Sequence, residues 1–223
     1  SLPVVAKTLS RGLLMGARGN SGVILSQIFR GFYQYIGDRE ELTVKEYAEA
    51  LLNGSKLAYK AVMRPVEGTI LTVVRESTET CSLYLEDHSD VTVEEFMVML
   101  CKEARASLDR TPELLPVLKE AHVVDSGGAG LVVILDGFKA FLDGSPITSA
   151  EKVEKSSEAK NEHASGYRTE FILDFDEKHS HSFNEDRFRK SLEQLGNKIT
   201  LLADDKTIKV RVNTMTPGEV LML

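Results

Sequence analysis

Apolar side chains recur every three or four residues through the first two thirds of the chain, which is the period of amphipathic α-helices. Two of these stripes begin at a Thr that is followed three residues later by a Glu, namely Thr43 with Glu46 and Thr92 with Glu95. This spacing is typical of a capping box, in which the two side chains bind N–H groups at the start of a helix. The predicted helices cover about residues 44–62, 70–84 and 93–108.

Two further patterns lie near the end of this helical region. Thr111 followed by Pro112 indicates a helix start with proline in the first turn, where its missing N–H costs nothing, and Pro116 would then bend or shorten that helix. Residues 131–142, LVVILDGFKAFL, are apolar nearly all round. We therefore expect them to form a helix buried in the centre of a bundle.

The pattern changes after residue 144. Residues 145–165 are rich in Ser, Glu and Lys and have almost nothing to bury, which is typical of a linker. Apolar and polar residues then alternate along 167–175 and 208–212, as in strands, and a helix is expected from Asn184 to Gly196, with Phe183 and Phe188 as a hydrophobic staple. The predicted organisation is a mainly α bundle (1–144), a linker (145–165) and a small α+β domain (166–223).

Composition and charge narrow the classes of function. The net charge is -7 at pH 7, and Lys and Arg are scattered, so we expect no nucleic-acid partner. Cys81 and Cys101 lie in helical patterns without metal or redox spacing, which predicts two buried thiols in a reducing compartment. Because no apolar run is long enough to span a bilayer and the first residues lack a signal-peptide layout, we expect a cytoplasmic protein without membrane insertion.

Candidate chemistry begins at residues 16–25, GARGNSGVIL, where glycines precede a helix. Glycine lets the backbone approach a ligand closely, and the free N–H groups of a first turn favour an anion. The stretch is neither a P-loop, since no Lys follows the last Gly, nor a dinucleotide fingerprint, since no strand precedes it. The alternative is a tight helix-to-helix turn with Asn20 or Ser21 as N-cap.

Two further Gly-containing stretches open predicted helices, PVEGT at residues 65–69 and VDSGG at residues 124–128. Three such helix N-termini in one bundle would suit a single anionic ligand. Each is equally well explained as an ordinary cap, because caps use the same residue types. The pattern alone leaves both interpretations open.

Four motifs in order, MGARGNSGVILSQIFRGF, PVEGTILTV, RTPELLPVLKEA and VVDSGGAGL, resemble the nucleotide-binding domain of the ATP-binding subunit of bacterial fatty acid kinase. That domain is related to the L subunit of dihydroxyacetone kinase. The resemblance covers about residues 4–144 and continues more faintly through GYRTEFIL, LEQLG and DDKTIKVRVNTMTPGEVL, which are similar to the start of the family's middle domain. It implies a barrel of antiparallel helices with ATP at one end.

The resemblance also implies which residues meet the nucleotide. The glycine-rich turn would lie at the phosphates, and the other two stretches beside the nucleotide, with the Thr-Pro pair lining the same region. The residues implied are Gly19, Asn20, Ser21, Gly22, Gly68, Thr69, Ile70, Thr111, Pro112, Asp125, Ser126 and Gly127.

Magnesium is implied for the full-length family member, but its ligands come from an Asp-rich DGDTG-type motif upstream of the glycine-rich turn, and these residues contain no such motif. The pairs Asp174–Asp176 and Asp204–Asp205 are better explained as an outward strand face and a turn. We therefore predict no metal ligands in this chain. Alone, it should hold magnesium poorly and transfer little phosphate.

In the middle domain, the family places Cys and two His side chains suited to zinc where this chain has Arg168, Arg211 and Asn213. Arginine cannot ligate a metal, so a salt-bridge or surface role is expected for both arginines. His179 and His181 lie in a polar stretch without a third ligand and are expected to be solvated.

The reaction implied by the resemblance is phosphoryl transfer from ATP to a fatty acid carboxylate, which gives an acyl phosphate. A separate DegV-like lipid-binding protein would present the fatty acid, and a homodimer is compatible with the sequence. One alternative is a dihydroxyacetone-kinase-like transferase with another small acceptor. The other is a non-catalytic nucleotide-sensing or scaffolding module.

Overall fold

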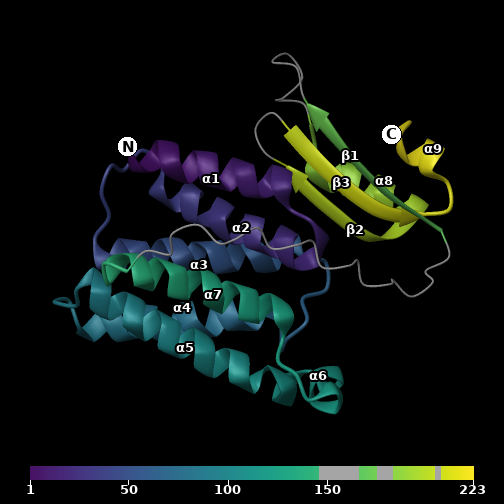
Figure 1. The fold of residues 1–223 in the computed structure, drawn as a ribbon. Helices are drawn as coiled ribbons and strands as arrows, with labels where there is room; N and C mark the ends of the chain where they lie inside the picture. The colour runs from purple at the N-terminus through teal and green to yellow at the C-terminus, as the bar shows by residue number, and fades with distance from the viewer. Residues whose placement is uncertain (146–165, 175–182, 204–206) are drawn as a thin grey trace. The chain divides into compact units, whose positions relative to one another are not determined.

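The computed structural model describes residues 1–145, 166–174, 183–203 and 207–223 (Figure 1). The chain forms two compact units, Ser1–Glu151 and Lys152–Leu223, each with its own hydrophobic core. The division falls within the segment predicted as a linker, of which residues 146–165 lie outside the described residues.

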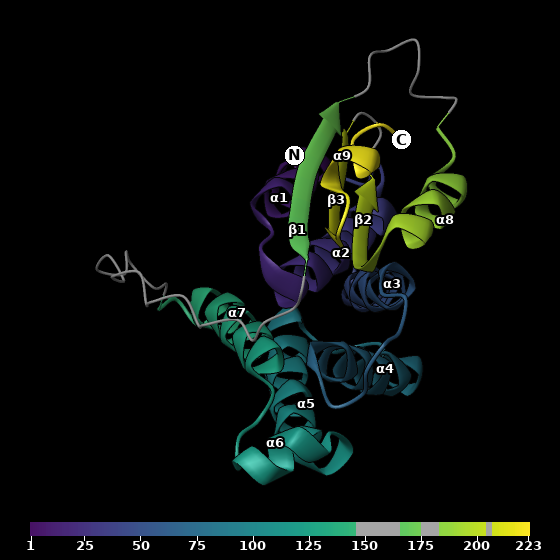
Figure 2. The ribbon, with the colours of Figure 1, turned by 90° about the vertical axis from the view of Figure 1, so that its right-hand side faces the viewer.

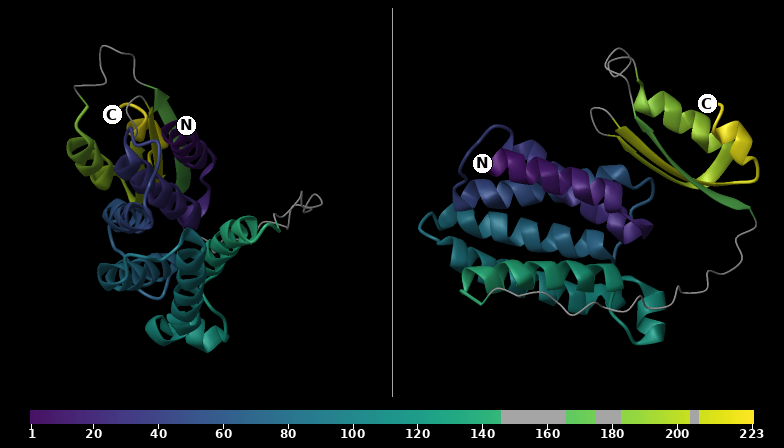
Figure 3. Two further views of the ribbon diagram at one scale, coloured as in Figure 1. Left: turned by 90° about the vertical axis from the view of Figure 1, so that its left-hand side faces the viewer. Right: turned by 45° about the horizontal axis from the view of Figure 1, so that its top comes forward.

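The first unit is a bundle of helices, which confirms the mainly α prediction. Its long helices run antiparallel to their neighbours in the chain, so the N-termini of the second, fourth and seventh helices lie at the same end (Figures 1 and 3). The helices are α1 (Leu2–Gly16), α2 (Gly19–Ile36), α3 (Val44–Ala61), α4 (Ile70–Asp87), α5 (Val93–Leu114), the short α6 (Pro116–Ala121) and α7 (Ser126–Leu142).

Both predicted capping boxes are present. At the start of α3, the backbone N–H of Thr43 donates to Glu46 Oε2 at 2.8 Å, and the N–H of Glu46 donates to Thr43 Oγ1 at 3.2 Å. At the start of α5, the corresponding distances for Thr92 and Glu95 are 3.0 and 3.2 Å. These local hydrogen bonds explain why both helices begin where the sequence predicts.

The core of the bundle includes both cysteines, as predicted. Cys81 on α4 and Cys101 on α5 are buried free thiols. Burial raises the pKa of the Cys81 thiol to about 12. It also raises the pKa of Cys101 to about 11, with a further contribution from the charge of Asp136. Neither thiol is poised for chemistry at neutral pH.

Helices α2 and α3 meet backbone to backbone. A Cβ on Gly31 would lie 2.7 Å from the carbonyl oxygen of Asn53 and from the Cα of Gly54, and a Cβ on Gly54 would collide with the carbonyl oxygen of Ile28. The Asn53 amide Nδ2 donates to the Gly31 carbonyl at 2.8 Å. Two glycines are therefore required for α2 to lie this close to α3.

The prediction that Thr111–Pro112 begins a helix is wrong. Helix α5 continues to Leu114 with Pro112 inside its last turn, and the proline that begins a helix is Pro116, at the start of α6. A proline four residues after Leu108 leaves the Leu108 carbonyl without its helical N–H donor. The Thr111 hydroxyl donates to that carbonyl at 2.7 Å and replaces the lost hydrogen bond.

The prediction that residues 131–142 are buried all round is wrong in part. Helix α7 begins at Ser126 and buries Gly128, Leu131, Val132 and Leu135, whereas the side chain of Val133 stays 66% exposed. Phe138 and Phe141 are likewise exposed. The helix packs against α5 and α4 and keeps one side free of them (Figure 2).

The second unit is the predicted small α+β domain. Its antiparallel sheet has the order β1-β3-β2, and Leu192 and Phe188 of α8 pack on Ile208, Val210 and Val212 of β3. Strand β2 was not predicted, because ITLL at 199–202 lacks the two-residue alternation. The elements are β1 (Tyr167–Asp174), α8 (Glu185–Leu195), β2 (Gly196–Ala203), β3 (Thr207–Thr214) and the short α9 (Pro217–Val220).

Helix α8 begins as predicted. Asn184 accepts a hydrogen bond from the backbone N–H of Arg187 at 2.9 Å, which makes it the N-cap. The rings of Phe183 and Phe188 pack edge to face with centroids 5.4 Å apart, as in a hydrophobic staple.

The expected salt bridge of Arg211 is present. Its guanidinium donates to Glu170 Oε2 at 2.8 and 2.9 Å, and Lys209 lies 3.2 Å from the other carboxylate oxygen. Arg168 and Asn213 are cross-strand partners in the same sheet. Asp174 is exposed and accepts from the Thr207 hydroxyl at 2.8 Å. The other acidic and His candidates lie outside the described residues: Asp176, His179, His181, Asp204 and Asp205.

Candidate functional site at three helix N-termini

The three glycine-containing stretches come together at one end of the first unit. A Cβ on Gly127 of α7 would lie 2.7 Å from the hydroxyl oxygen of Ser21 on α2 and 3.3 Å from the Cβ of Ile70 on α4. It would also lie 3.1 Å from Asp125 Oδ2. Because these residues belong to the first turns of three helices, or directly precede them, three positive helix ends converge here.

The N-terminus of α2 is the most open of the three. Its N-cap residue, Arg18, makes no side-chain hydrogen bond to the first turn, and that turn contains no acidic residue. Gly19, at φ +69°, Asn20 and Ser21 are all exposed. The first N–H groups of an α-helix have no partner within the helix, so this end is well suited to bind an anion.

The N-terminus of α7 carries its own cap. Asp125 Oδ2 accepts from the backbone N–H of Gly128 at 2.6 Å, and the backbone N–H of Asp125 donates to the Thr111 hydroxyl oxygen at 3.1 Å. Ser126 is exposed and Gly127 is partly exposed. The carboxylate of Asp125 is thus directed toward its own helix, while Thr111 ties this turn to the end of α5.

The N-terminus of α4 is also capped from within. The Thr69 hydroxyl oxygen accepts from the N–H of Leu71 at 3.3 Å and donates to the Val66 carbonyl at 2.8 Å. Gly68 has φ +78° and is packed so tightly that a Cβ would lie 2.9 Å from the Thr111 carbonyl oxygen. Its N–H donates inward to Thr72 Oγ1 at 2.8 Å. Gly68 therefore shapes the turn and has no N–H to offer a ligand.

Thr111 and Pro112 lie behind the site. The Thr111 side chain is fully buried, and both of its hydrogen bonds are made within the protein. Pro112 is half-buried in the last turn of α5. Among the residues expected at a nucleotide, the structure brings Ser21, Ile70, Asp125 and Gly127 into one cluster, with Thr111 as their support.

A polar network beside this cluster was missed by the sequence analysis. The carboxylate of Glu67 accepts hydrogen bonds from Tyr59, Thr72 and Arg75 at 3.0, 2.6 and 3.0 Å. Burial is the largest single influence on the pKa of Glu67 and raises it, but these hydrogen bonds together outweigh it and lower the pKa below its ordinary value. The sequence signal was Glu67 itself, an acidic residue directly before the turn at Gly68.

The cluster does not suit a dedicated magnesium site. Magnesium is usually held by one or two carboxylates together with phosphate oxygens and water. Asp125 supplies the cluster's carboxylate, and its Oδ2 is already bound to the N–H of Gly128. Over the described parts of the chain, no group of three or more His, Cys, Asp or Glu side chains could hold a metal ion.

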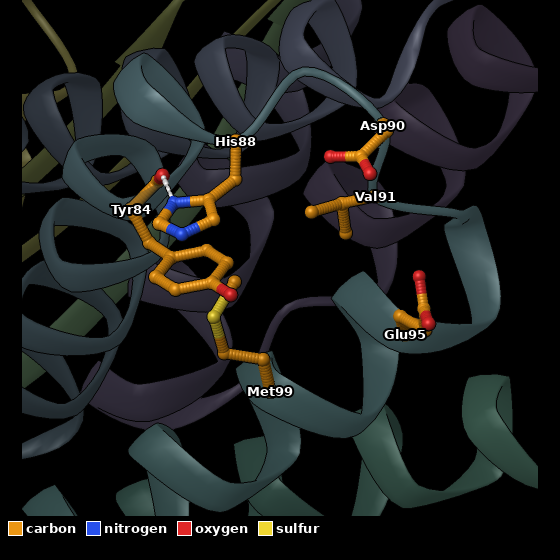
Figure 4. Close-up of a pocket in the computed structure, with 6 residues that line it drawn as sticks. All are labelled: Tyr84, His88, Asp90, Val91, Glu95 and Met99. Carbon is orange, nitrogen blue, oxygen red and sulfur yellow. Dashed lines mark hydrogen bonds between the residues drawn. The ribbon is translucent and has the colours of Figure 1, made fainter.

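A separate hollow of about 350 Å³ lies at the other end of α4 (Figure 4). The rings of Tyr84 and His88 stack there with centroids 3.9 Å apart, and His88 Nδ1 lies 2.8 Å from the Tyr84 carbonyl oxygen. Glu95, which lines it, is engaged in the capping box with Thr92. Because Tyr84 lies 14 residues after Ile70 on α4, about 21 Å of helix separates this hollow from the α4 N-terminus.

Comparisons with known proteins identify the family of this chain. The model of the DAK2 domain family matches residues 1–140. The chain belongs to the DAK2 family. Residues 164–223 of this DAK2 protein match a second model, which describes the middle domain of FakA-like fatty acid kinase proteins. It is therefore a member of a kinase family with both domains in the expected order.

Curated bacterial relatives extend across both units of the DAK2 protein. Protein YloV of Bacillus subtilis is 44% identical over 231 residues, which cover 97% of this chain and 41% of that protein. A protein of Staphylococcus saprophyticus is 43% identical over 228 residues, with coverages of 97% and 41%. The chain spans about two fifths of the length of the curated relatives it matches. Within the described residues, no helix combines the length and apolar character needed to cross a membrane.

Proposed function

We propose that this DAK2 protein is the nucleotide-binding part of a fatty acid kinase. ATP would bind at the three helix N-termini, and its γ-phosphate would pass to the carboxylate of a fatty acid held by a separate DegV-like lipid-binding protein. A carboxylate oxygen would form the new bond to phosphorus as the bond to ADP breaks, giving an acyl phosphate and ADP. The match to the middle domain of FakA-like fatty acid kinase proteins supports this choice of acceptor.

One observation carries the proposal. The α2 N-terminus has no side-chain cap and no acid in its first turn, whereas the two N-termini beside it are capped by Thr69 and Asp125. The first N–H groups of α2 have no partner within the helix and are therefore free to donate to a ligand. An uncapped, exposed helix end beside two other positive helix ends favours the binding of a polyphosphate.

The residues of this chain would bind and orient the nucleotide. The first N–H groups of α2 and the Ser21 hydroxyl would donate to phosphate oxygens, and Arg18, at the N-cap of α2, would add positive charge. Asp125 and Thr111 would keep the first turn of α7 in place beside Ser21. Since the cluster does not suit magnesium by itself, no step of the transfer is assigned to a metal bound by these residues.

The first test is calorimetric titration of ADP and ATP, with and without magnesium, into this chain and into the full-length protein. Tight binding by the full-length protein with magnesium supports a kinase site. Weak binding by this chain in the same buffer would show that its own residues form an incomplete site. If neither protein binds nucleotide, the glycine turns are ordinary caps and the proposal is wrong.

The acceptor needs a second test. The full-length protein is incubated with ATP and a fatty-acid-loaded DegV-like protein, and acyl phosphate is trapped with hydroxylamine as the hydroxamate. Hydroxamate that requires both proteins supports the proposal. Transfer to dihydroxyacetone instead would assign a dihydroxyacetone-kinase-like activity, and nucleotide binding without any turnover would assign a sensing or scaffolding module.

A further inference from the structure

We propose that Glu67 is a positioning residue of the nucleotide site, which fixes the Gly68–Thr69 turn at the N-terminus of α4. This inference rests on the proposed nucleotide binding and names a residue through which that binding is controlled. Glu67 precedes the turn and is joined by hydrogen bonds to α3 and α4.

The carboxylate is held by three donors from two helices. Its Oε2 atom accepts from the Thr72 hydroxyl at 2.6 Å and from the Arg75 guanidinium at 3.0 Å. Its Oε1 atom accepts from the Tyr59 hydroxyl, also at 3.0 Å. Hydrogen bonds to an ionised acceptor are stronger than those between neutral groups, so Glu67 is held in one place.

Glu67 determines what the Thr72 hydroxyl can do. A hydroxyl has one proton to donate, and that proton is directed to Glu67, which leaves the oxygen lone pairs for the N–H of Gly68 at 2.8 Å. Thr72 is fully buried, so its hydroxyl is shielded from bulk water. Without Glu67, this hydroxyl would turn to a backbone carbonyl, as Thr side chains do within helices, and the Gly68 N–H would lose its aligned acceptor.

Arg75 links the network to the rest of the bundle. Its Nε donates to the Tyr59 hydroxyl oxygen at 3.0 Å, and its guanidinium lies 5.9 Å from the centre of the Tyr59 ring. It also contacts Glu79 at 3.4 Å, one turn further along α4 and away from the Gly68 turn. Glu79 therefore shares Arg75 with Glu67 but has no hydrogen bond to the turn among those described.

The network orients the turn more than it stabilises the fold. The Glu67 side chain is 47% exposed and that of Arg75 is 33% exposed, and ion pairs at this exposure contribute little to stability. The left-handed turn at Gly68, in contrast, leads directly into the first turn of α4, where the Cβ of Ile70 lies beside Gly127. Loss of Glu67 should therefore weaken ligand binding without unfolding the bundle.

The experiment compares Glu67→Ala with Glu79→Gln, a control for the loss of one negative charge beside Arg75, in the full-length protein. ADP affinity is measured by calorimetry and thermal unfolding by circular dichroism. We expect Glu67→Ala to raise the Kd for ADP about tenfold while the melting temperature falls by no more than about 4 °C. Glu79→Gln should leave both quantities unchanged.

Two variants of Thr72 test whether the effect of Glu67 on ADP binding passes through the Thr72 hydroxyl. Thr72→Ser retains the hydroxyl and should bind ADP like the natural protein, whereas Thr72→Val lacks it and should weaken binding as Glu67→Ala does. If the natural protein binds ADP and Glu67→Ala binds equally well, this inference alone is wrong. Equal weakening by Glu67→Ala and Glu79→Gln would also overturn it, because the effect would then be one of general charge. If the natural protein does not bind ADP, the proposed function itself fails.

Discussion

The backbone N–H of Asp125 donates to the hydroxyl oxygen of Thr111 at 3.1 Å, which joins the start of α7 to the last turn of α5. The same hydroxyl donates to the Leu108 carbonyl that Pro112 leaves without a helical partner. The hydroxyl of one fully buried side chain thus provides two missing hydrogen bonds. It donates to the carbonyl that has lost its donor to proline, and it accepts from the N–H at a helix cap.

Replacing Thr111 with Val should therefore be costly. The change keeps the shape of the side chain but leaves a partly buried N–H and a buried carbonyl unpaired, so we expect the free energy of unfolding to fall by roughly 1–3 kcal/mol. Thr111→Ser keeps both hydrogen bonds and should lose about 1 kcal/mol or less, for the missing methyl group. Urea unfolding followed by circular dichroism at 222 nm measures both; equal losses would show that packing alone matters here.

The contact between α2 and α3 makes a second prediction. Gly54→Ala would place a methyl group against the Ile28 carbonyl, so we expect a loss of about 1–3 kcal/mol as the two helices are forced apart. Gly137→Ala on α7 is the matched control, because its Cβ would meet nothing within 4 Å. Since Ala is the better helix former, that variant should gain about 0.5–1 kcal/mol. The same unfolding experiment tests whether the two signs differ.

A negative charge at the α2 N-terminus tests where the phosphates bind. Ser21→Asp places a carboxylate at the positive end of the helix, but the nearby Asp125 carboxylate opposes the gain, so we expect the free energy of unfolding to change by less than about 1 kcal/mol. The same charge would repel phosphates and sharply weaken ADP binding. Ser21→Asn has nearly the same size without the charge and serves as control. If Ser21→Asp and Ser21→Asn bind ADP alike, the phosphates do not lie at this helix end.

Acid should destabilise the first unit through Glu67. Its pKa in the folded protein lies below the ordinary value of 4.5, so its contribution to stability is present above that value and is lost as the pH falls through the folded pKa. We expect the free energy of unfolding to decline below about pH 4.5 and Glu67→Gln to flatten part of this decline. Some slope should remain, because hydrogen bonds from the Thr43 backbone and hydroxyl also lower the pKa of Glu46.

The elements that the sequence predicted well depend on hydrogen bonds within a few residues. The capping boxes at Thr43 and Thr92 and the N-cap at Asn184 each involve a partner three residues along the chain. The local sequence is therefore enough to predict where these helices begin. The sequence analysis placed a helix start at Thr111–Pro112, whereas α6 begins at Pro116. Pro112 is tolerated inside α5 because the Thr111 hydroxyl replaces the lost hydrogen bond, and helix propensities do not include such a contact.

Features that depend on how many other helices surround a given helix could not be predicted from the local sequence. The apolar sequence of α7 does not distinguish a helix surrounded by others from one with an open side, where Val133 and Phe141 remain exposed. The meeting of Ser21, Ile70 and Gly127 likewise depends on how three helices pack. The sequence suggested three helix ends that suit an anion, and the structure brings them together.

The two buried thiols have a practical consequence for the study of this protein. Cys81 and Cys101 are its two cysteines, and their pKa values of about 12 and about 11 leave almost no thiolate at neutral pH. Maleimide reagents react with the thiolate, so they should not label these two cysteines in the folded protein. A cysteine introduced at Gly16, which is exposed and where a Cβ would meet nothing within 4 Å, would become the preferred attachment point for a fluorophore. Ligand-induced changes beside the α2 N-terminus can then be followed optically with both natural cysteines retained.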